Sequence, residues 1–151
     1  MTRGYTLVEL LITISVMGLL FAAGTLSFRE FSRNQAVYNS AKQVIADLRL
    51  AQQQALSGYK PVGCNGTLQR YEFTRVSATS YQVSAVCDSP VVVKSATMPG
   101  NTTITYSGAA IGFKPVAQGT SLLVPSVTIT IGASDTATQQ NIVISQSGDI
   151  R

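Results

Sequence analysis

Few side chains in this sequence have types and spacing that suggest chemistry, and the clearest is a carboxylate at the start of an apolar run. Glu9 is followed by residues 10–28, which carry no charge. As an acid at a helix start it would contribute well under about 2 kcal/mol. A charge at mid-bilayer costs about 2.5 to 3.5 kcal/mol, and less near the interface where Glu9 would lie. We therefore expect Glu9 to have a specific partner.

Catalytic and metal-binding patterns are poorly represented. The sequence contains no histidine, which is the commonest general base and metal ligand. Neither a close acid pair nor a nucleophile-base spacing is visible, and the scattered Asp88, Asp135 and Asp149 form no loop with EF-hand spacing. We expect no enzymatic activity, no cofactor and no metal site.

The two cysteines, Cys64 and Cys87, lie 23 positions apart. In an exported protein such a pair indicates one disulfide, which would stabilise the fold by about 3 kcal/mol. In a cytosolic protein the same residues would be two unpaired thiols. The apolar N-terminus argues for export and so favours the disulfide.

The elements that must position these residues begin with a long helix. Residues 10–28 would form about 28 Å of helix, close to the thickness of a bilayer core. A cleaved signal peptide is the alternative, with 22–24 as its cleavage site. Glu9 opposes that interpretation, and so does the short segment Met1-Thr2-Arg3 that precedes the apolar run.

The helical pattern continues beyond the apolar run but becomes amphipathic. Apolar residues spaced by three and four predict one buried face: Val37, Ala41, Val44, Leu48, Ala51 and Ala55. Polar residues are expected on the remaining surface: Arg33, Lys42, Asp47, Arg49, Gln53 and Gln54. One helix over residues 5–57 would be about 80 Å long. Gly58 and Pro61 predict its end.

The rest of the sequence predicts a β-rich head. Strands are expected at 67–73, 79–87, 91–98, 102–106, 127–132 and 141–145. Val127, Ile129 and Ile131 alternate with threonines and should share one face, which Ile142 and Ile144 could repeat on a partner strand. Tyr59, Tyr71, Tyr81 and Tyr106 are expected to be half-buried. The predicted fold is α+β, with antiparallel sheets packed on the amphipathic half of the helix.

The segment Gly4-Tyr5-Thr6-Leu7-Val8-Glu9 resembles the signal of type IV prepilins and type II secretion pseudopilins. The resemblance implies that a prepilin peptidase cleaves after Gly4 and N-methylates Tyr5, which stands where most members have Phe. It also implies that Glu9 neutralises the new amine of an adjacent subunit. The side chains implied to pack helix against helix in a filament core include Leu7, Leu10, Leu11 and Ile14.

The resemblance implies four segments. Residues 1–4 are the leader, 5–28 the transmembrane and filament-core helix, 29–57 the amphipathic half of that helix, and 58–151 the β-rich head. The protein would be a single-pass inner-membrane protein with an extracytoplasmic, periplasmic head, which later enters a pilus or pseudopilus. Its implied partners are other pilin or pseudopilin subunits, prepilin peptidase, the inner membrane and the inner-membrane assembly platform.

Weaker motifs resemble the H-type pseudopilins and the FimT-like minor pilins. They occupy residues 47–51, 111–119 and 143–151. Some FimT-like proteins bind DNA through a C-terminal Gly-Arg-x-Arg, and the corresponding residues here are Gly148-Asp149-Ile150-Arg151. Arg151 is thus a weak DNA-binding candidate, because Asp149 subtracts charge where phosphate would lie. We expect a structural filament subunit; a tip subunit that binds DNA for uptake is the alternative, and a membrane-anchored enzyme a third one.

Overall fold

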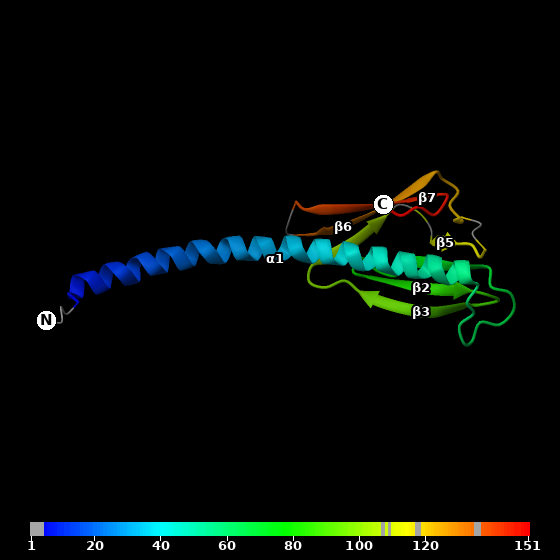
Figure 1. Cartoon of the computed structure of the whole chain (residues 1–151), viewed down its shortest axis with the longest axis horizontal. Helices are drawn as coiled ribbons and strands as arrows, with labels where there is room; N and C mark the ends of the chain where they lie inside the picture. The colour runs from blue at the N-terminus through cyan, green and yellow to red at the C-terminus, as the bar shows by residue number, and fades with distance from the viewer. Residues whose placement is uncertain (1–4, 107, 109, 117–118, 135–136) are drawn as a thin grey trace.

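One long helix and two antiparallel sheets form the protein (Figure 1). The computed structural model describes residues 5–106, 108, 110–116, 119–134 and 137–151, with the backbone alone for 24–27. The helix α1 spans Leu7–Ser57, 51 residues and about 77 Å. It ends as predicted at Gly58, whose φ of 63° is the left-handed conformation that glycine tolerates.

The two halves of α1 have different surroundings. The first half extends away from the strands, and its described side chains over residues 7–23 are exposed (Figure 1). The second half lies against both sheets and buries one face. Its buried apolar residues are those predicted from their spacing: Val37, Ala41, Val44, Leu48, Ala51 and Ala55.

Within the described residues, seven strands form two sheets, and all of the strand pairs there are antiparallel. The four-stranded sheet has the order β3 (Pro90–Thr97), β2 (Ser80–Val86), β1 (Arg70–Arg75) and β5 (Ile111–Phe113). The three-stranded sheet has the order β4 (Thr102–Tyr106), β6 (Ser126–Ala133) and β7 (Gln139–Ser145). This arrangement confirms the predicted α+β class.

The register of β6 and β7 follows the apolar alternation in the sequence. Val127 pairs with Ile144, and Ile129 pairs with Ile142. All four side chains are buried, as is Ile131. The alternation thus identified both strands and the face that each turns toward the core.

The short strand β5 was not predicted. It has three residues, all of them buried, so it shows no alternation that a sequence pattern could reveal. Gly112 lies at its centre, where a Cβ would overlap the side chain of Ser121. The side chains of Ser121 and Arg70 therefore leave little room for a larger residue at this position.

Two tyrosines expected to be half-buried are fully buried instead. Tyr71 and Tyr81 have exposed fractions of 0% and 1%. The ring of Tyr81 lies on that of Phe73 in β1, with the centroids 4.9 Å apart. Each hydroxyl has a hydrogen-bond partner, Tyr59 O for Tyr71 and Asp47 Oδ2 for Tyr81. This pairing is what allows a phenol to be buried.

Candidate assembly site

The start of α1 places Glu9 in the first helical turn. Thr6 is the N-cap, and its hydroxyl oxygen accepts a hydrogen bond of 3.3 Å from the Glu9 backbone N–H. A carboxylate three residues after the cap lies near the positive end of the helix dipole. Gly4, the predicted cleavage position, lies outside the described residues.

The Glu9 side chain is exposed in the single chain. Within the part of the chain that the structure describes, no ion pair includes it. Tyr5, the first residue that the structure describes, is 80% exposed. The geometry therefore leaves this carboxylate available to a cation from another molecule.

The predicted helix-packing residues form an exposed apolar surface. Leu7, Leu10, Leu11 and Ile14 are 77%, 55%, 58% and 62% exposed. Burying each of them would contribute about 1.5 to 3 kcal/mol. Within the described residues, α1 is the one helix long and apolar enough to cross a membrane. A bilayer or the helices of neighbouring subunits could cover this surface.

Two hydrogen bonds join the second half of α1 to the three-stranded sheet and to the segment before β7. Thr138 Oγ1 donates to Asn34 Oδ1 over 2.7 Å, from the segment before β7. Ser40 and Thr102 share a buried hydroxyl contact of 3.3 Å, which joins the helix to β4. These contacts connect Asn34 and Ser40 of α1 directly to the head.

Asp47 joins α1 to the four-stranded sheet, although it was expected on the polar surface. Its side chain is buried, with 4% exposed, and it accepts from Lys94 Nζ over 2.6 Å and from Tyr81 Oη over 2.8 Å. One carboxylate thus binds α1 to β2 and β3. A sequence signal did exist, because Asp47 lies three residues after Val44 and four before Ala51, on the buried face.

Burial raises the pKa of Tyr81 strongly, and the neighbouring Asp47 carboxylate raises it further. Burial also raises the pKa of Tyr71, with a smaller contribution from Tyr59. Both phenols therefore stay protonated at physiological pH. Tyr81 can act as a permanent donor to Asp47.

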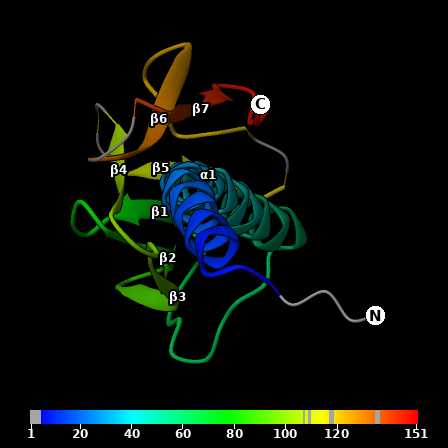
Figure 2. The same cartoon turned by 90° about the vertical axis from the view of Figure 1, so that its left-hand side faces the viewer.

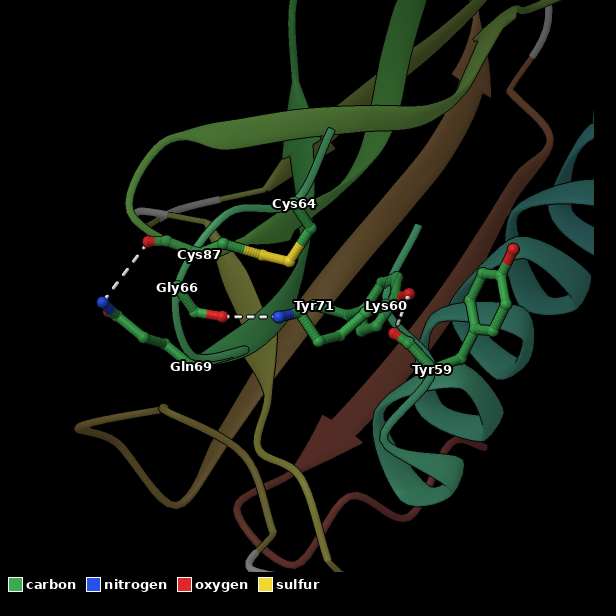
Figure 3. The surroundings of a disulfide bond; sticks show 7 residues. All are labelled: Tyr59, Lys60, Cys64, Gly66, Gln69, Tyr71 and Cys87. Carbon is green, nitrogen blue, oxygen red and sulfur yellow. Dashed lines mark hydrogen bonds between the residues drawn. A yellow bond between two sulfur atoms is a disulfide. The ribbon is translucent and has the colours of Figure 1, made fainter. Parts of the chain in front are cut away.

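The predicted disulfide between Cys64 and Cys87 is present (Figure 3). It connects the loop after α1 to the end of β2, with 5.6 Å between the Cα atoms. Lys60 Nζ donates to Gly66 O over 2.6 Å in the same loop, and the Asp88 N–H donates to Asn65 O. Covalent and hydrogen bonds together hold this loop against the sheet.

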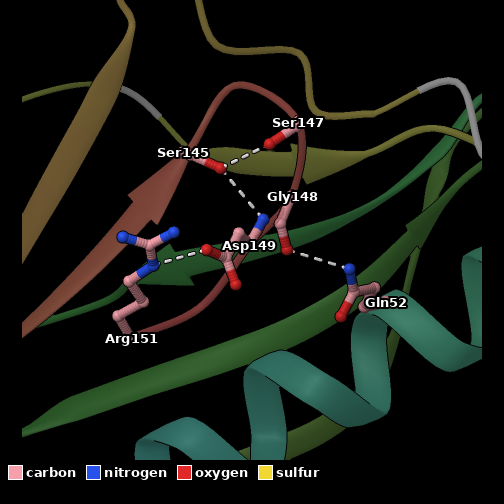
Figure 4. A network of polar contacts seen from close by, with 6 residues as sticks. All are labelled: Gln52, Ser145, Ser147, Gly148, Asp149 and Arg151. Carbon is pink, nitrogen blue, oxygen red and sulfur yellow. Dashed lines mark hydrogen bonds and ion pairs between the residues drawn. The ribbon is translucent and has the colours of Figure 1, made fainter.

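The C-terminal segment is also held in place (Figure 4). Arg151 exchanges two backbone hydrogen bonds with Val143 in β7, and Gln52 Nε2 of α1 donates to Gly148 O over 2.9 Å. The Arg151 guanidinium lies 2.6 Å from the carboxylate of Asp149. Asp149, which stands where the DNA-binding motif has its first arginine, therefore also pairs with Arg151, the arginine that remains.

A metal site has no support from the arrangement of carboxylates. Among the residues that the structure describes, no three His, Cys, Asp or Glu side chains lie close enough to hold a metal ion. Asp135, one of the three aspartates considered from the sequence, lies outside the described residues.

Two family models match the sequence. The model described as type II transport protein GspH matches residues 40–148, which cover most of the head and the last part of α1 packed on it. The model described as prokaryotic N-terminal methylation motif matches residues 1–25. No curated protein and no solved structure matches the sequence.

Proposed function

Because this chain belongs to the family of type II transport protein GspH, we propose that it is a structural subunit of a type II secretion pseudopilus or a related type IV pilus-like filament. One combination of features supports this most strongly. The match to the methylation motif includes the start of α1, and the first half of that helix is apolar and exposed. The second half of the same helix is packed on the head, which matches the GspH model. The description of the family favours the secretion pseudopilus.

Maturation would begin at the N-terminus. A prepilin peptidase cleaves after Gly4 and methylates the amine of Tyr5 in this proposal. Cleavage removes Arg3, so the formal net charge falls from +4 to +3 (+4 minus 1). Cleavage also turns the backbone nitrogen of Tyr5 into a charged N-terminal amine next to the apolar segment.

Assembly would then use the features at the start of α1. Glu9 pairs with the Tyr5 amine of an adjacent subunit, which satisfies both charges in an apolar surrounding. Leu7, Leu10, Leu11 and Ile14 pack between neighbouring helices. In this proposal residues 5–28 form the filament core, 29–57 carry the head, and 58–151 form the head surface.

Before assembly, the apolar half anchors the protein in a membrane. We propose a single pass through the inner membrane with the head in the periplasm, where a disulfide between Cys64 and Cys87 can form. The inner-membrane assembly platform and other pilin-like subunits are the proposed partners. Pilins and pseudopilins are structural proteins, and we propose no catalytic role.

The alternative of DNA capture at a filament tip has less support. Arg151, the remaining basic residue of the motif, is paired with Asp149. A phosphate would have to compete with that carboxylate, so the net attraction for DNA is reduced. We therefore favour the role in assembly.

Intact mass spectrometry of the protein purified from its host tests the proposal. The expected mature chain begins at Tyr5 and carries one added methyl group. A chain that retains Met1, or one that starts near Thr25 after cleavage as a signal peptide, would exclude the proposed maturation. Incorporation into filaments, measured in sheared fractions, tests the structural role separately.

A further inference from the structure

A polar hollow lies where the apolar half of α1 meets the head. Its volume is about 350 Å³, and Ser32, Arg33 and Ala36 of α1 contribute to its lining. The head contributes residues 100–102, from the turn between β3 and β4, and Ala133 at the end of β6. That turn lies at the end of the head nearer the apolar half (Figure 1), and Figure 2 looks onto this end along α1.

Arg33 supplies the charge of the polar hollow. Arg29 lies one turn earlier on α1, about 40° around the helix from Arg33 and on the side of Ala36. Neither arginine belongs to an ion pair among the residues that the structure describes. Glu30, the carboxylate nearest in sequence, lies about 60° from Arg33 in the opposite direction. The polar hollow therefore suits an anion, because its described lining residues include a cation and no carboxylate.

An apolar hollow of about 380 Å³ adjoins the polar one, since Ser32 and Ala36 line both. Phe28, Phe31 and Pro99 contribute to its walls. Phe28 and Phe31 are 70% and 66% exposed, so this apolar surface is accessible in the single chain. We call the two hollows together the junction site. A molecule that fits the junction site carries an anionic group next to hydrocarbon.

The length of the helix determines the height of the junction site relative to a bilayer. With residues 10–28 in the hydrocarbon core, Arg29 and Arg33 lie about 1.5 Å and about 7.5 Å beyond it. The headgroup layer on each side of that core is about 5 to 7 Å thick. Arginine side chains are long enough to reach phosphates from such positions. The polar hollow thus lies at the level of the lipid phosphates, and Phe28 marks the boundary with the acyl chains.

We propose that the junction site binds the headgroup of one anionic phospholipid while the protein is anchored in the membrane. Arg33, with Arg29 beside it, donates charge-assisted hydrogen bonds to the phosphate. The glycerol backbone and the first methylene groups of the lipid occupy the apolar hollow beside Phe28 and Phe31. An anionic headgroup such as phosphatidylglycerol fits better than a zwitterionic one, whose ammonium group would lie near the arginines. The inference rests on the membrane anchoring in the proposed function and adds a lipid ligand to it.

Native mass spectrometry of the full mature chain, purified from its host in detergent, tests this selectivity. Phosphatidylglycerol and phosphatidylcholine with the same acyl chains are added in equal amounts, so that contacts of hydrocarbon with the apolar half cancel. The parent protein should retain phosphatidylglycerol about fivefold more than phosphatidylcholine, as expected for one arginine at an anionic lipid surface. Arg33→Gln should bring this ratio close to one. Arg49→Gln, the matched control, removes the same charge from an exposed position about 24 Å further along α1 and should preserve the ratio.

A second pair of variants tests the hollows separately from the charge. Ala36→Leu adds a larger side chain where the two hollows meet and should lower the ratio as Arg33→Gln does. Ala46→Leu, the matched control at an exposed position of the same helix, should have no effect. If Ala36→Leu does not fold, Ser32→Leu gives the same comparison, because Ser32 is exposed and lines both hollows. Inorganic phosphate at the concentration of the lipid should not displace it, because phosphate has no apolar part.

Photo-crosslinking locates the lipid on the full chain in its host. A benzophenone amino acid replaces Phe31, and mass spectrometry of the membrane fraction identifies what is attached to it. The expected adduct has the mass of an anionic phospholipid. The same probe at Val92, which is 53% exposed on β3, is the control and should give no lipid adduct.

Four outcomes would overturn the inference: equal retention of the two lipids, an equal loss of preference with Arg49→Gln, displacement of the lipid by inorganic phosphate, or attachment of a protein instead of a lipid at Phe31. The intact mass of the same samples separates this failure from a failure of the proposed function. A methylated mature chain that starts at Tyr5 and shows no lipid preference refutes the inference alone. A chain that starts near Thr25 has lost the membrane segment and refutes the proposed function.

Discussion

Lys94 Nζ lies 2.6 Å from Asp47 Oδ1 and forms an ion pair that joins β3 to the second half of α1. The Arg151–Asp149 pair has the same length but a different environment. The Asp47 and Lys94 side chains are 4% and 43% exposed, whereas the side chains of Asp149 and Arg151 are 49% and 83% exposed. Burial, not distance, determines what each pair contributes to stability.

Lys94→Ala should therefore destabilise the head by about 1 to 3 kcal/mol, because it leaves a buried carboxylate without its cation. Arg151→Ala, the matched control, should cost no more than about 0.5 kcal/mol. The measurement is urea unfolding of the full chain in detergent, followed by near-ultraviolet circular dichroism. Equal shifts of the two midpoints would show that Asp47 does not depend on Lys94.

The pH dependence of stability should reflect the two buried tyrosines. Folding raises the pKa of Tyr81 and of Tyr71, so the unfolded chain releases these protons near pH 10 while the folded chain retains them. Their contribution is complete below about pH 10 and decreases as the pH rises above it. Thermal unfolding midpoints between about pH 8 and about pH 11 should fall at the alkaline end. Tyr81→Phe should reduce that fall, and a slope identical to that of the parent would contradict the assignment.

Removal of the disulfide should destabilise the head without changing the helix. Cys64→Ser with Cys87→Ser should cost about 3 kcal/mol, as expected for a closed loop of this length. Reduction of the parent protein should lower its unfolding midpoint to a similar extent. The doubly substituted protein should show no response to reductant, which makes it the control for effects of the reagent itself.

Glu9→Gln should leave cleavage after Gly4 largely intact and reduce incorporation into filaments by at least about tenfold, since an unpaired buried charge costs about 3 to 5 kcal/mol. Quantitative blotting of sheared filaments against membranes measures the ratio. Normal incorporation of this variant would remove the proposed role of Glu9.

Two further variants separate charge from helix capping. Glu30→Gln removes an exposed carboxylate beyond the apolar half and should have no effect on incorporation. Thr6→Ala removes the side chain that caps α1, at a cost of about 1 kcal/mol. If Thr6→Ala reproduced the full loss seen with Glu9→Gln, the start of the helix and not the charge would be responsible.

Local patterns in the sequence were sufficient for the long elements. The three- and four-residue spacing of apolar side chains predicted the buried face of α1, and Gly58 predicted its end. Strict alternation predicted the core faces of β6 and β7. Such patterns are reliable because each residue in a regular element faces the core or solvent at a fixed period.

The tertiary structure alone decided which residues meet across the chain. Asp47 and Lys94 are 47 positions apart, and no local period shows that a strand will place a lysine beside that helix position. Tyr81 was misjudged for the same reason, since its burial depends on the acceptor that Asp47 provides. β5 has too few residues for a period to be visible, and contacts with β1 define it. The sequence by itself thus determined the elements and the N-terminal motif, whereas long-range packing determined how the head is fixed to the helix.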